Sequence, residues 1–268
     1  MRLNTPQKIS VISFVLLVVF WSVLYFMDMK EGFYNYLYSF LFGLIPFFGG
    51  IVAMFAATKW GGFKTAIGKA VFFIGLGIFL WGCGENIWSY YNFFMGVPAP
   101  YPSLADIGFA PSIFFYGLGT FYLSKVTGAK FGLRNVYAKI FVVTAPLILL
   151  CLSYYAFVIV ARGGVLVPAG ETALKTILDI AYPLGDFMGV TIATVISGLS
   201  FRYMGGKYTF DIVAILLGLV VMTAADFVFS YTTTVGTYYN GNFGDLMLTT
   251  GLFLLSFGVL GFYKVKEF

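Results

Sequence analysis

Long apolar stretches alternate with short polar segments along the whole chain. Eight of these stretches reach the roughly 20 residues that a helix needs to cross about 30 Å of hydrocarbon. The predicted spans are 9–27, 34–58, 65–94, 104–125, 136–161, 174–201, 209–231 and 243–263. The pattern therefore predicts an all-α polytopic membrane protein with eight transmembrane helices. The first stretch is too long for a signal-peptide core and lacks a small-x-small cleavage site, so we expect it to be retained.

The segment 81–122 recurs in degenerate form at 225–263. Each copy has a carboxylate inside an apolar helix, a polar turn, a second carboxylate and another apolar helix. Glu85 and Asp106 in the first copy correspond to Asp226 and Asp245 in the second. Glycine pairs also recur between the preceding helices, at 61–62 and 205–206. We therefore expect two four-helix repeats, 1–130 and 131–268, which are parallel because each has an even number of helices.

The composition and the charge distribution agree with a membrane location. Only 10% of the residues are charged, against about 25% in soluble domains. The net charge of +5 does not indicate nucleic-acid binding, because the basic residues lie in short loops between apolar stretches. Of the 16 Lys and Arg residues, all but Lys30, Arg162 and Lys175 fall on the side of the N-terminus. The positive-inside rule then predicts a cytoplasmic-membrane protein with both termini in the cytoplasm.

Missing residue types exclude several kinds of chemistry. There is no His, which excludes His-ligated haem, His-based zinc sites and Ser-His-Asp catalysis. Cys83 and Cys151 stand apart in apolar stretches, and we interpret them as buried free thiols. No nucleophile–base pair is visible, so the sequence predicts no catalytic residues, no metal site and no cofactor. Only chemistry carried by carboxylates alone stays open.

The acidic residues are distributed in the opposite way to the basic ones. All but Asp211 and Glu267 fall at the outer surface or in the outer part of the membrane. We expect one layer of carboxylates there, with no Lys or Arg inside the helices to compensate them. Like charges at that depth cannot all ionise, so some should be protonated or bind a cation. The layer consists of Glu85, Asp106, Asp179, Asp186, Asp226 and Asp245.

Glu85 has the most suggestive helical surroundings. Trp81, Trp88, Ser89 and Asn92 follow the spacing of one helix face around it. Ionisable residues in spanning helices usually face the bundle interior and indicate a functional site. The structural alternative is a protonated or hydrogen-bonded carboxyl that joins two helices.

The other intramembrane acids allow similar interpretations. Asp226 is the counterpart of Glu85 and carries the same two alternatives. Asp179 and Asp186 are seven residues apart on one face, with Tyr182 between them and Pro183 beside it. Asp186 is the deeper of the two and the better site candidate, whereas Asp179 is either part of the site or interfacial.

Asp106 and Asp245 occupy the starts of apolar helices. The segments 103–106 and 242–245 read Ser-Leu-Ala-Asp and Asn-Phe-Gly-Asp. Both fit a capping pattern in which the first residue caps the helix and the acid three positions later bonds back. The helix dipole also favours an acid there. For these two residues we favour the structural role.

The acids together with nearby aromatic residues suggest a ligand. Trp81, Trp88, Tyr90, Tyr91 and Tyr182 could hold a small cationic or amphiphilic molecule through cation–π contacts. The alternative is an ordinary aromatic belt at the membrane interface. The predicted ligand-binding set is Glu85, Asp186, Asp226, Trp81, Trp88, Tyr182, Asp106 and Asp245.

Two short motifs carry a family resemblance. Pro102-Ser103-Leu-Ala-Asp106 follows a helix with Trp and Tyr, and Tyr182-Pro-Leu-Gly-Asp186 lies in a later helix. This pair resembles the multi-helix membrane module at the N-terminus of some bacterial and archaeal histidine kinases and diguanylate cyclases. The resemblance implies a sensory input domain. Those proteins continue into a cytoplasmic output domain, whereas the sequence here ends at 268. We therefore expect it to signal through a partner or to use the same fold for something else.

The expected function is therefore that of a non-enzymatic membrane sensor or ligand-binding protein. It would bind its ligand in the outer leaflet and relay occupancy to a protein partner in the membrane or the cytoplasm. The first alternative is a transporter that uses the same carboxylates for protons or cations. The second is a structural or accessory subunit of a larger membrane complex.

Overall fold

The computed structural model describes residues 3–127, 134–166, 169–170, 172–200 and 206–264. Every regular element in these ranges is helical, and eight helices are long and apolar enough to cross a membrane. The predicted fold class, an all-α polytopic membrane protein, is confirmed at this level. Glu171, Gly205, Glu267 and the expected boundary between 130 and 131 lie outside the described residues.

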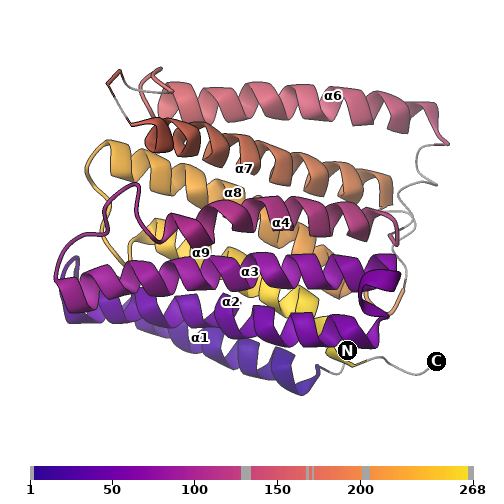
Figure 1. The fold of residues 1–268 in the computed structure, drawn as a ribbon, viewed down its shortest axis with the longest axis horizontal. Helices are drawn as coiled ribbons and strands as arrows, with labels where there is room; N and C mark the ends of the chain where they lie inside the picture. The colour runs from indigo at the N-terminus through magenta and orange to yellow at the C-terminus, as the bar shows by residue number, and fades with distance from the viewer. Residues whose placement is uncertain (1–2, 128–133, 167–168, 171, 201–205, 265–268) are drawn as a thin grey trace.

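The eight long helices match the predicted spans closely (Figure 1). Two of them, α3 and α6, continue as π-helical turns. One short 3-10 turn precedes α3, and another follows α9. The helices are α1 Thr5–Phe26, α2 Phe33–Lys59, α3 Ala66–Tyr90, α4 Asp106–Ser124, α6 Val136–Ser153, α7 Ala173–Ser200, α8 Thr209–Thr234 and α9 Phe243–Leu260. The short elements are η1 Gly62–Lys64, η2 Tyr91–Met95, η3 Tyr154–Val160 and η4 Gly261–Tyr263.

Polar residues mark the helix starts. Asn4 accepts from the backbone N–H of Gln7 at 2.9 Å, and the Gln7 side chain accepts from the Asn4 backbone at 3.3 Å. This capping box satisfies two of the backbone donors that a helix N-terminus leaves free. Thr65 caps α3 in the same way, through the N–H of Gly68 at 3.0 Å. Local sequence therefore sets where these apolar runs become helices.

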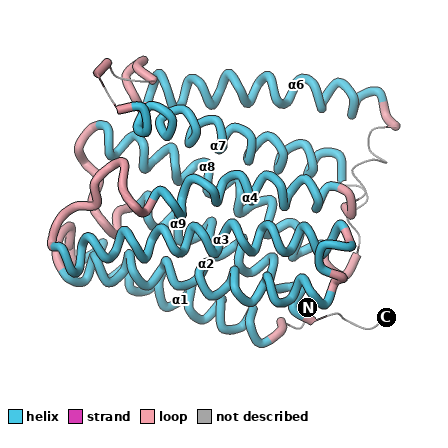
Figure 2. Tube along the Cα trace, in the orientation of Figure 1, coloured by secondary structure: helices cyan, strands magenta, loops and turns pink. Residues whose placement is uncertain are grey.

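The helices form one bundle with α6 and α7 along one edge and α1 near the opposite edge (Figures 1 and 2). α3 packs between α2 and α4, α8 packs on α9, and α2 also packs on α9. α4 packs on α7, which in turn contacts α6 and α8. α6 reaches the rest of the bundle mainly through α7, so α6 and α7 form a peripheral pair, which we call the α6–α7 hairpin.

Glycines set the closest helix approaches. A Cβ atom on Gly50 of α2 would lie 2.5 Å from the Gly75 carbonyl oxygen of α3. A Cβ on Gly77 of α3 would lie 2.6 Å from the Tyr116 ring of α4. Such contacts need residues without side chains, because they bring backbone against backbone or ring. They explain why α2, α3 and α4 pack tightly.

The bundle has two distinguishable ends. The start of α1 meets the end of α9, where Asn4 Nδ2 donates to the Leu260 carbonyl at 2.7 Å. We call this the terminal end; the turn 60–65 also lies there, with Trp60 Nε1 donating to the Phe262 carbonyl at 2.7 Å. The opposite, distal end holds the connections 27–32, 96–105 and 235–242 (Figure 2). The candidate site residues gather toward the distal end.

Candidate functional site

The six predicted acids fall into three separate groups rather than one shared site. Glu85 and Asp245 belong to the first group, at the junction of α2, α3 and α9. Asp186 and Asp226 form the second, between α7 and α8. Asp106 and Asp179 are in the third, where the 96–105 connection meets α7.

Glu85 is buried and held from α2 and from the α8–α9 connection. Its Oε1 accepts a hydrogen bond from Ser39 Oγ at 2.6 Å. Ser39 Oγ also lies 3.3 Å from Asn240 Oδ1, which accepts from Trp88 Nε1 at 3.1 Å. Space for the carboxyl comes from Gly43, where a Cβ would lie 2.6 Å from Glu85 Cγ. The structural alternative for Glu85, a hydrogen-bonded carboxyl between helices, describes this geometry well.

Asp245 completes the first group and combines capping with a side-chain contact. Asn242 Oδ1 accepts from the Asp245 backbone N–H at 3.0 Å, as the capping pattern predicts. The carboxylate bonds back to the Gly241 N–H at 2.6 Å, one residue earlier than the pattern requires. Tyr238 OH also donates to Asp245 Oδ1 at 3.3 Å. Burial, together with the Asp245 and Glu85 charges, raises the pKa of Tyr238 well above its usual range, so it acts as a neutral donor.

Two further buried polar atoms on the Glu85 face have no hydrogen-bond partner among the described residues. Ser89 is 2% exposed and Asn92 is 5% exposed, and neither Ser89 Oγ nor Asn92 Nδ2 has a partner among the described residues. Buried polar groups without partners are rare in native proteins. This face of α3 therefore keeps hydrogen-bonding capacity that the protein does not use.

Asp186 and Asp226 contact each other across the α7–α8 interface. Asp186 is 8% exposed, Asp226 is half-buried, and the two carboxyl groups are close enough to interact directly. A hydrogen bond between them requires a proton on one of the two groups, because two carboxylates have no hydrogen to share. Thr223 Oγ1 adds a contact to the Asp186 backbone carbonyl at 3.3 Å. The pair is thus a place where a proton joins two helices.

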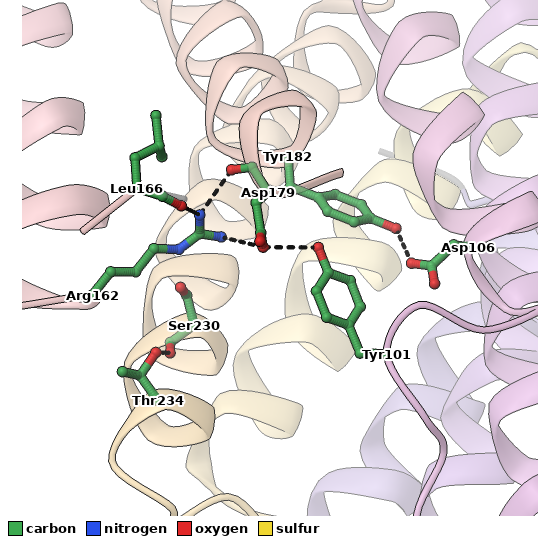
Figure 3. A network of polar contacts seen from close by, with 8 residues as sticks. All are labelled: Tyr101, Asp106, Arg162, Leu166, Asp179, Tyr182, Ser230 and Thr234. Atoms are coloured by element: carbon green, nitrogen blue, oxygen red, sulfur yellow. Dashed lines mark hydrogen bonds and ion pairs between the residues drawn. The ribbon is translucent and has the colours of Figure 1, made fainter. Parts of the chain in front are cut away.

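Asp106 links α4 to α7 (Figure 3). Its Oδ2 accepts from the Ser103 N–H at 2.7 Å, which is the predicted bond back to the start of the turn. Ser103 Oγ itself accepts from the Ala105 N–H at 3.2 Å instead of from Asp106. The free Oδ1 of Asp106 accepts from Tyr182 OH at 2.5 Å. The two motifs that carry the family resemblance therefore touch each other.

Asp179 is compensated by a basic residue, contrary to the expectation of an uncompensated acidic layer. Arg162 Nη2 lies 3.6 Å from Asp179 Oδ1, and Arg162 Nη1 donates to the Asp179 carbonyl at 2.8 Å. The same Nη1 lies 3.2 Å from the Leu166 carbonyl. The expectation counted only Lys and Arg within helices, whereas Arg162 reaches Asp179 from the connection that precedes α7 (Figure 3). Its position as one of three basic residues on the distal side was the available signal.

Tyr101 connects this ion pair to the α3–α4 connection. Its OH donates to Asp179 Oδ1 at 3.1 Å (Figure 3). Partial burial, and then the Asp179 charge, raise the pKa of Tyr101 above its usual range, so the phenol stays neutral and donates. Nothing in the sequence distinguishes Tyr101, since a tyrosine in a polar turn has no characteristic pattern.

The predicted aromatic residues divide between core, site and surface. Trp81 is buried and packs on Phe42 and Phe109, with ring centroids 5.8 and 5.1 Å away. Tyr90 is exposed and Tyr91 is half-buried, toward the distal end of α3. Of the five, Trp88 and Tyr182 make hydrogen bonds to the polar groups described above. A single acidic and aromatic pocket is therefore not what the fold assembles.

Two other predictions are affected by the structure. Cys83 is half-buried and Cys151 is exposed, so the expectation that both thiols are buried is wrong for Cys151, which lies on the outer side of α6. Asp211, treated only as an inner acid, is 1% exposed and accepts from Gln7 Nε2 at 2.8 Å. In the sequence, the one indication of this contact is the position of Asp211 in the first turn of an apolar helix. The Gln7–Asp211 hydrogen bond ties α1 to α8 at the terminal end.

Within the described ranges, no three His, Cys, Asp or Glu side chains come close enough to hold a metal ion. No family model matches the chain, and neither a curated protein nor a solved structure does.

Proposed function

We propose that this polytopic membrane protein is a non-enzymatic sensor in which the Asp186–Asp226 pair controls the position of the α6–α7 hairpin. The observation that carries the proposal is the close approach of these two carboxyl groups across the α7–α8 interface. A hydrogen bond between them needs a proton, so we infer that the contact between hairpin and bundle depends on protonation or on a cation that replaces the proton.

The hairpin makes further polar contacts at the distal end. Tyr182 of α7 donates to Asp106 of α4 at 2.5 Å, and Tyr101 donates to Asp179 at 3.1 Å. These bonds and the Asp186–Asp226 pair attach α7 to three other parts of the chain. Polar contacts can be made and broken by small chemical changes, unlike the apolar contacts between α2, α3 and α4. The hairpin is therefore the element that we expect to move.

Loss of the shared proton would separate the pair. Two carboxylates in a low-dielectric interior repel each other strongly, and desolvation adds to the cost. The titratable side chains facing Asp226 are Tyr116 from α4 and Tyr182 from α7, in addition to Asp186. Neither tyrosine can neutralise a second negative charge. A small cationic or amphiphilic ligand would act at the same pair by replacing the proton.

The family resemblance supports a sensory role. Its two motifs, at 102–106 and 182–186, meet in the Tyr182–Asp106 hydrogen bond, and the second motif ends at Asp186. We place the terminal end in the cytoplasm, because the Lys and Arg residues favour that side. A protein partner could then detect the position of the hairpin by binding α6, which exposes Tyr137, Val143 and Leu147.

We also propose that the bundle is built from two parallel four-helix repeats, 1–130 and 131–268. Gly77 of α3 faces Tyr116 and the Ser112 carbonyl of α4, and Gly218 of α8 faces Leu255 and the Gly251 carbonyl of α9. The two sets differ by constant offsets that also relate Glu85 to Asp226 and Asp106 to Asp245. Helix pairs that cross in the same register support a common origin of the two halves.

Distances measured by electron paramagnetic resonance would test the sensor proposal. Cys83 and Cys151 are replaced by Ala, and spin labels are placed at Phe63 and Tyr137, both exposed. Phe63 lies in the turn 60–65 and Tyr137 begins the hairpin. Between about pH 5 and pH 9 we expect the mean distance to shift by about 2 Å, the scale of interhelical movements.

Three variants make the test specific. Asp186→Asn keeps an amide donor toward Asp226 at every pH, so it should abolish the pH response, and Asp226→Asn should act alike. Asp28→Asn removes an exposed acid that pairs only with Lys30 among the described residues and should leave the response unchanged. A pH response that survives both substitutions in the pair would refute the proposal.

The alternatives predict different results. Proton flux into vesicles containing the wild-type protein, abolished by Asp186→Asn, would indicate a transporter. A tightly co-purifying membrane protein, with no pH response of the distance, would indicate a subunit of a larger complex. A small-molecule adduct in native mass spectra that disappears in Glu85→Gln or Asp226→Asn would identify the mass of the ligand.

A further inference from the structure

Two apolar grooves of similar volume lie on the bundle, toward the terminal end. One, of about 700 Å³, runs between α1 and α2 and reaches Leu260 of α9. The other, of about 720 Å³, lies between α4 and the α6–α7 hairpin and includes Phe121 of α4. Both fall within the range of sites that hold small apolar ligands. In a membrane, both are accessible to lipid.

The two grooves occupy corresponding positions in the bundle. Gly119 of α4 packs on Ile74 of α3, and Gly258 of α9 packs on Ile215 of α8. Phe121 and Leu260 each follow their glycine by two residues, so they occupy matching places on the two helices. The first groove can therefore serve as a control site for lipid binding in the second groove.

The grooves differ in charge. Lys125 lines the groove beside the hairpin, and its Nζ lies 4.6 Å from the centre of the Phe121 ring. No acidic side chain of the described residues forms an ion pair with it. Lys139 lies one turn before the lining residue Val142 on the same face of α6. The residues that line the first groove include no Lys or Arg.

The polar atoms of the second groove suit the part of a lipid where the headgroup meets the acyl chains. Ser124 and Lys125 lie at its terminal end, while Val195 and Ile196 provide an apolar wall. Thr191 Oγ1 is buried, lines the groove and has no hydrogen-bond partner among the described residues. Charge is thus at one end and apolar surface along the length, as in a phospholipid.

We propose that the groove between α4 and the α6–α7 hairpin binds one anionic phospholipid. An acyl chain lies along Val195 and Ile196, and the phosphate lies at the Lys125 ammonium. Basic residues beside membrane helices attract anionic headgroups at about 1 kcal/mol each. The site follows from the groove and its charge, and it does not require that the protein be a sensor.

Native mass spectrometry of delipidated protein would test this proposal. Phosphatidylglycerol and phosphatidylcholine with identical chains are titrated separately. We expect the wild type to bind one phosphatidylglycerol more tightly than phosphatidylcholine. Lys125→Gln should weaken phosphatidylglycerol binding about fivefold, the equivalent of one such charge, and leave phosphatidylcholine unchanged. Val195→Trp fills the groove and should remove the tight site for both lipids.

Matched controls separate this site from lipid bound anywhere on the surface. Val52→Trp fills the first groove, and Lys64→Gln removes an exposed charge at the same end of the bundle. Both should retain the phosphatidylglycerol preference. Equal affinity of the wild type for the two lipids would overturn the proposal. An equal loss in Lys64→Gln and Lys125→Gln would do the same, since it would indicate adventitious surface lipid.

Discussion

Single residues decide how closely the helices approach and which polar atoms are satisfied. Gly50 and Gly43 leave room for a neighbouring backbone and for the Glu85 side chain. Asn240 accepts from Trp88, and its oxygen also lies beside Ser39 and Tyr238. At each of these three positions, several contacts depend on a single side chain or on its absence.

Gly50→Ala should loosen the α2–α3 contact. The added Cβ would lie 2.5 Å from the Gly75 carbonyl oxygen and 2.6 Å from the Phe79 backbone nitrogen, so the helices must separate. We expect a loss of about 1–3 kcal/mol in the free energy of unfolding, measured by titration with sodium dodecyl sulfate in mixed micelles. Gly117→Ala meets no atom within 4 Å and is the control. It should be neutral or stabilise by up to ~1 kcal/mol.

Tyr238 should make stability fall at alkaline pH. Its pKa in the folded protein is raised above the value of about 10 in an unfolded chain. Its neutral form therefore contributes stability below about pH 10, and this contribution is lost as the pH rises further. Tyr238→Phe should reduce the alkaline loss while lowering stability at neutral pH by about 1 kcal/mol, through loss of the Asp245 contact. The exposed Tyr137→Phe should change neither, and identical alkaline curves for wild type and Tyr238→Phe would refute the argument.

At the scale of elements, the α6–α7 hairpin differs from the rest of the bundle. α2, α3 and α4 are held by close apolar contacts at glycines. α7 packs on Ile113 of α4 through Gly185 and adds polar contacts at the distal end that involve Asp106, Asp179 and Asp186. Toward the terminal end, an apolar groove lies between α4 and the hairpin. We expect the hairpin to change position without disrupting the tightly packed helices.

Arg162→Gln should release the distal end of α7. The side chain of Asp179 is 9% exposed, and loss of its cationic partner leaves a buried charge whose remaining side-chain contact is Tyr101. Removing one partner of a buried ion pair costs about 3–5 kcal/mol. We expect faster hydrogen exchange in α7 and little change in α3. Lys30→Gln breaks an exposed ion pair and should alter neither helix, so equal effects of the two variants would contradict this account.

At the scale of the whole molecule, contacts between the halves hold the bundle together. α1, α2 and α3 pack on α9, and α4 packs on α7, so the proposed repeats contact each other on two helices of the second repeat. The Asn4–Leu260 and Asn35–Asn240 hydrogen bonds, at 2.7 and 2.8 Å, add polar links between chain positions more than 200 apart. The halves should therefore recognise each other as separate chains.

Co-expression of 1–130 and 131–268 as two chains tests that expectation. The break falls between the proposed repeats, so we expect the halves to co-purify and to resist protease as the intact protein does. A break between 98 and 99 is the control, because it separates α3 from α4 within one proposed repeat. That version should assemble less well. Equal assembly from both breaks would argue against the repeats as structural units.

The sequence by itself determined the eight spanning helices and several of their caps. A spanning helix satisfies its backbone hydrogen bonds internally, so its presence depends on local hydropathy and not on its neighbours. Asn242 likewise caps α9 through a bond to a residue three positions away. Both depend on short stretches of chain, which is why they could be predicted.

Only the tertiary structure decided which polar groups meet. Ser39 reaches Glu85, Tyr182 reaches Asp106 and Arg162 neutralises Asp179, although the sequence suggested one continuous acidic layer. These contacts depend on the order and rotation of packed helices, and residues far apart in the chain set both. Hydropathy places a carboxylate at a depth in the membrane. Packing determines which neighbour it has there, and therefore whether it binds, titrates or simply holds two helices together.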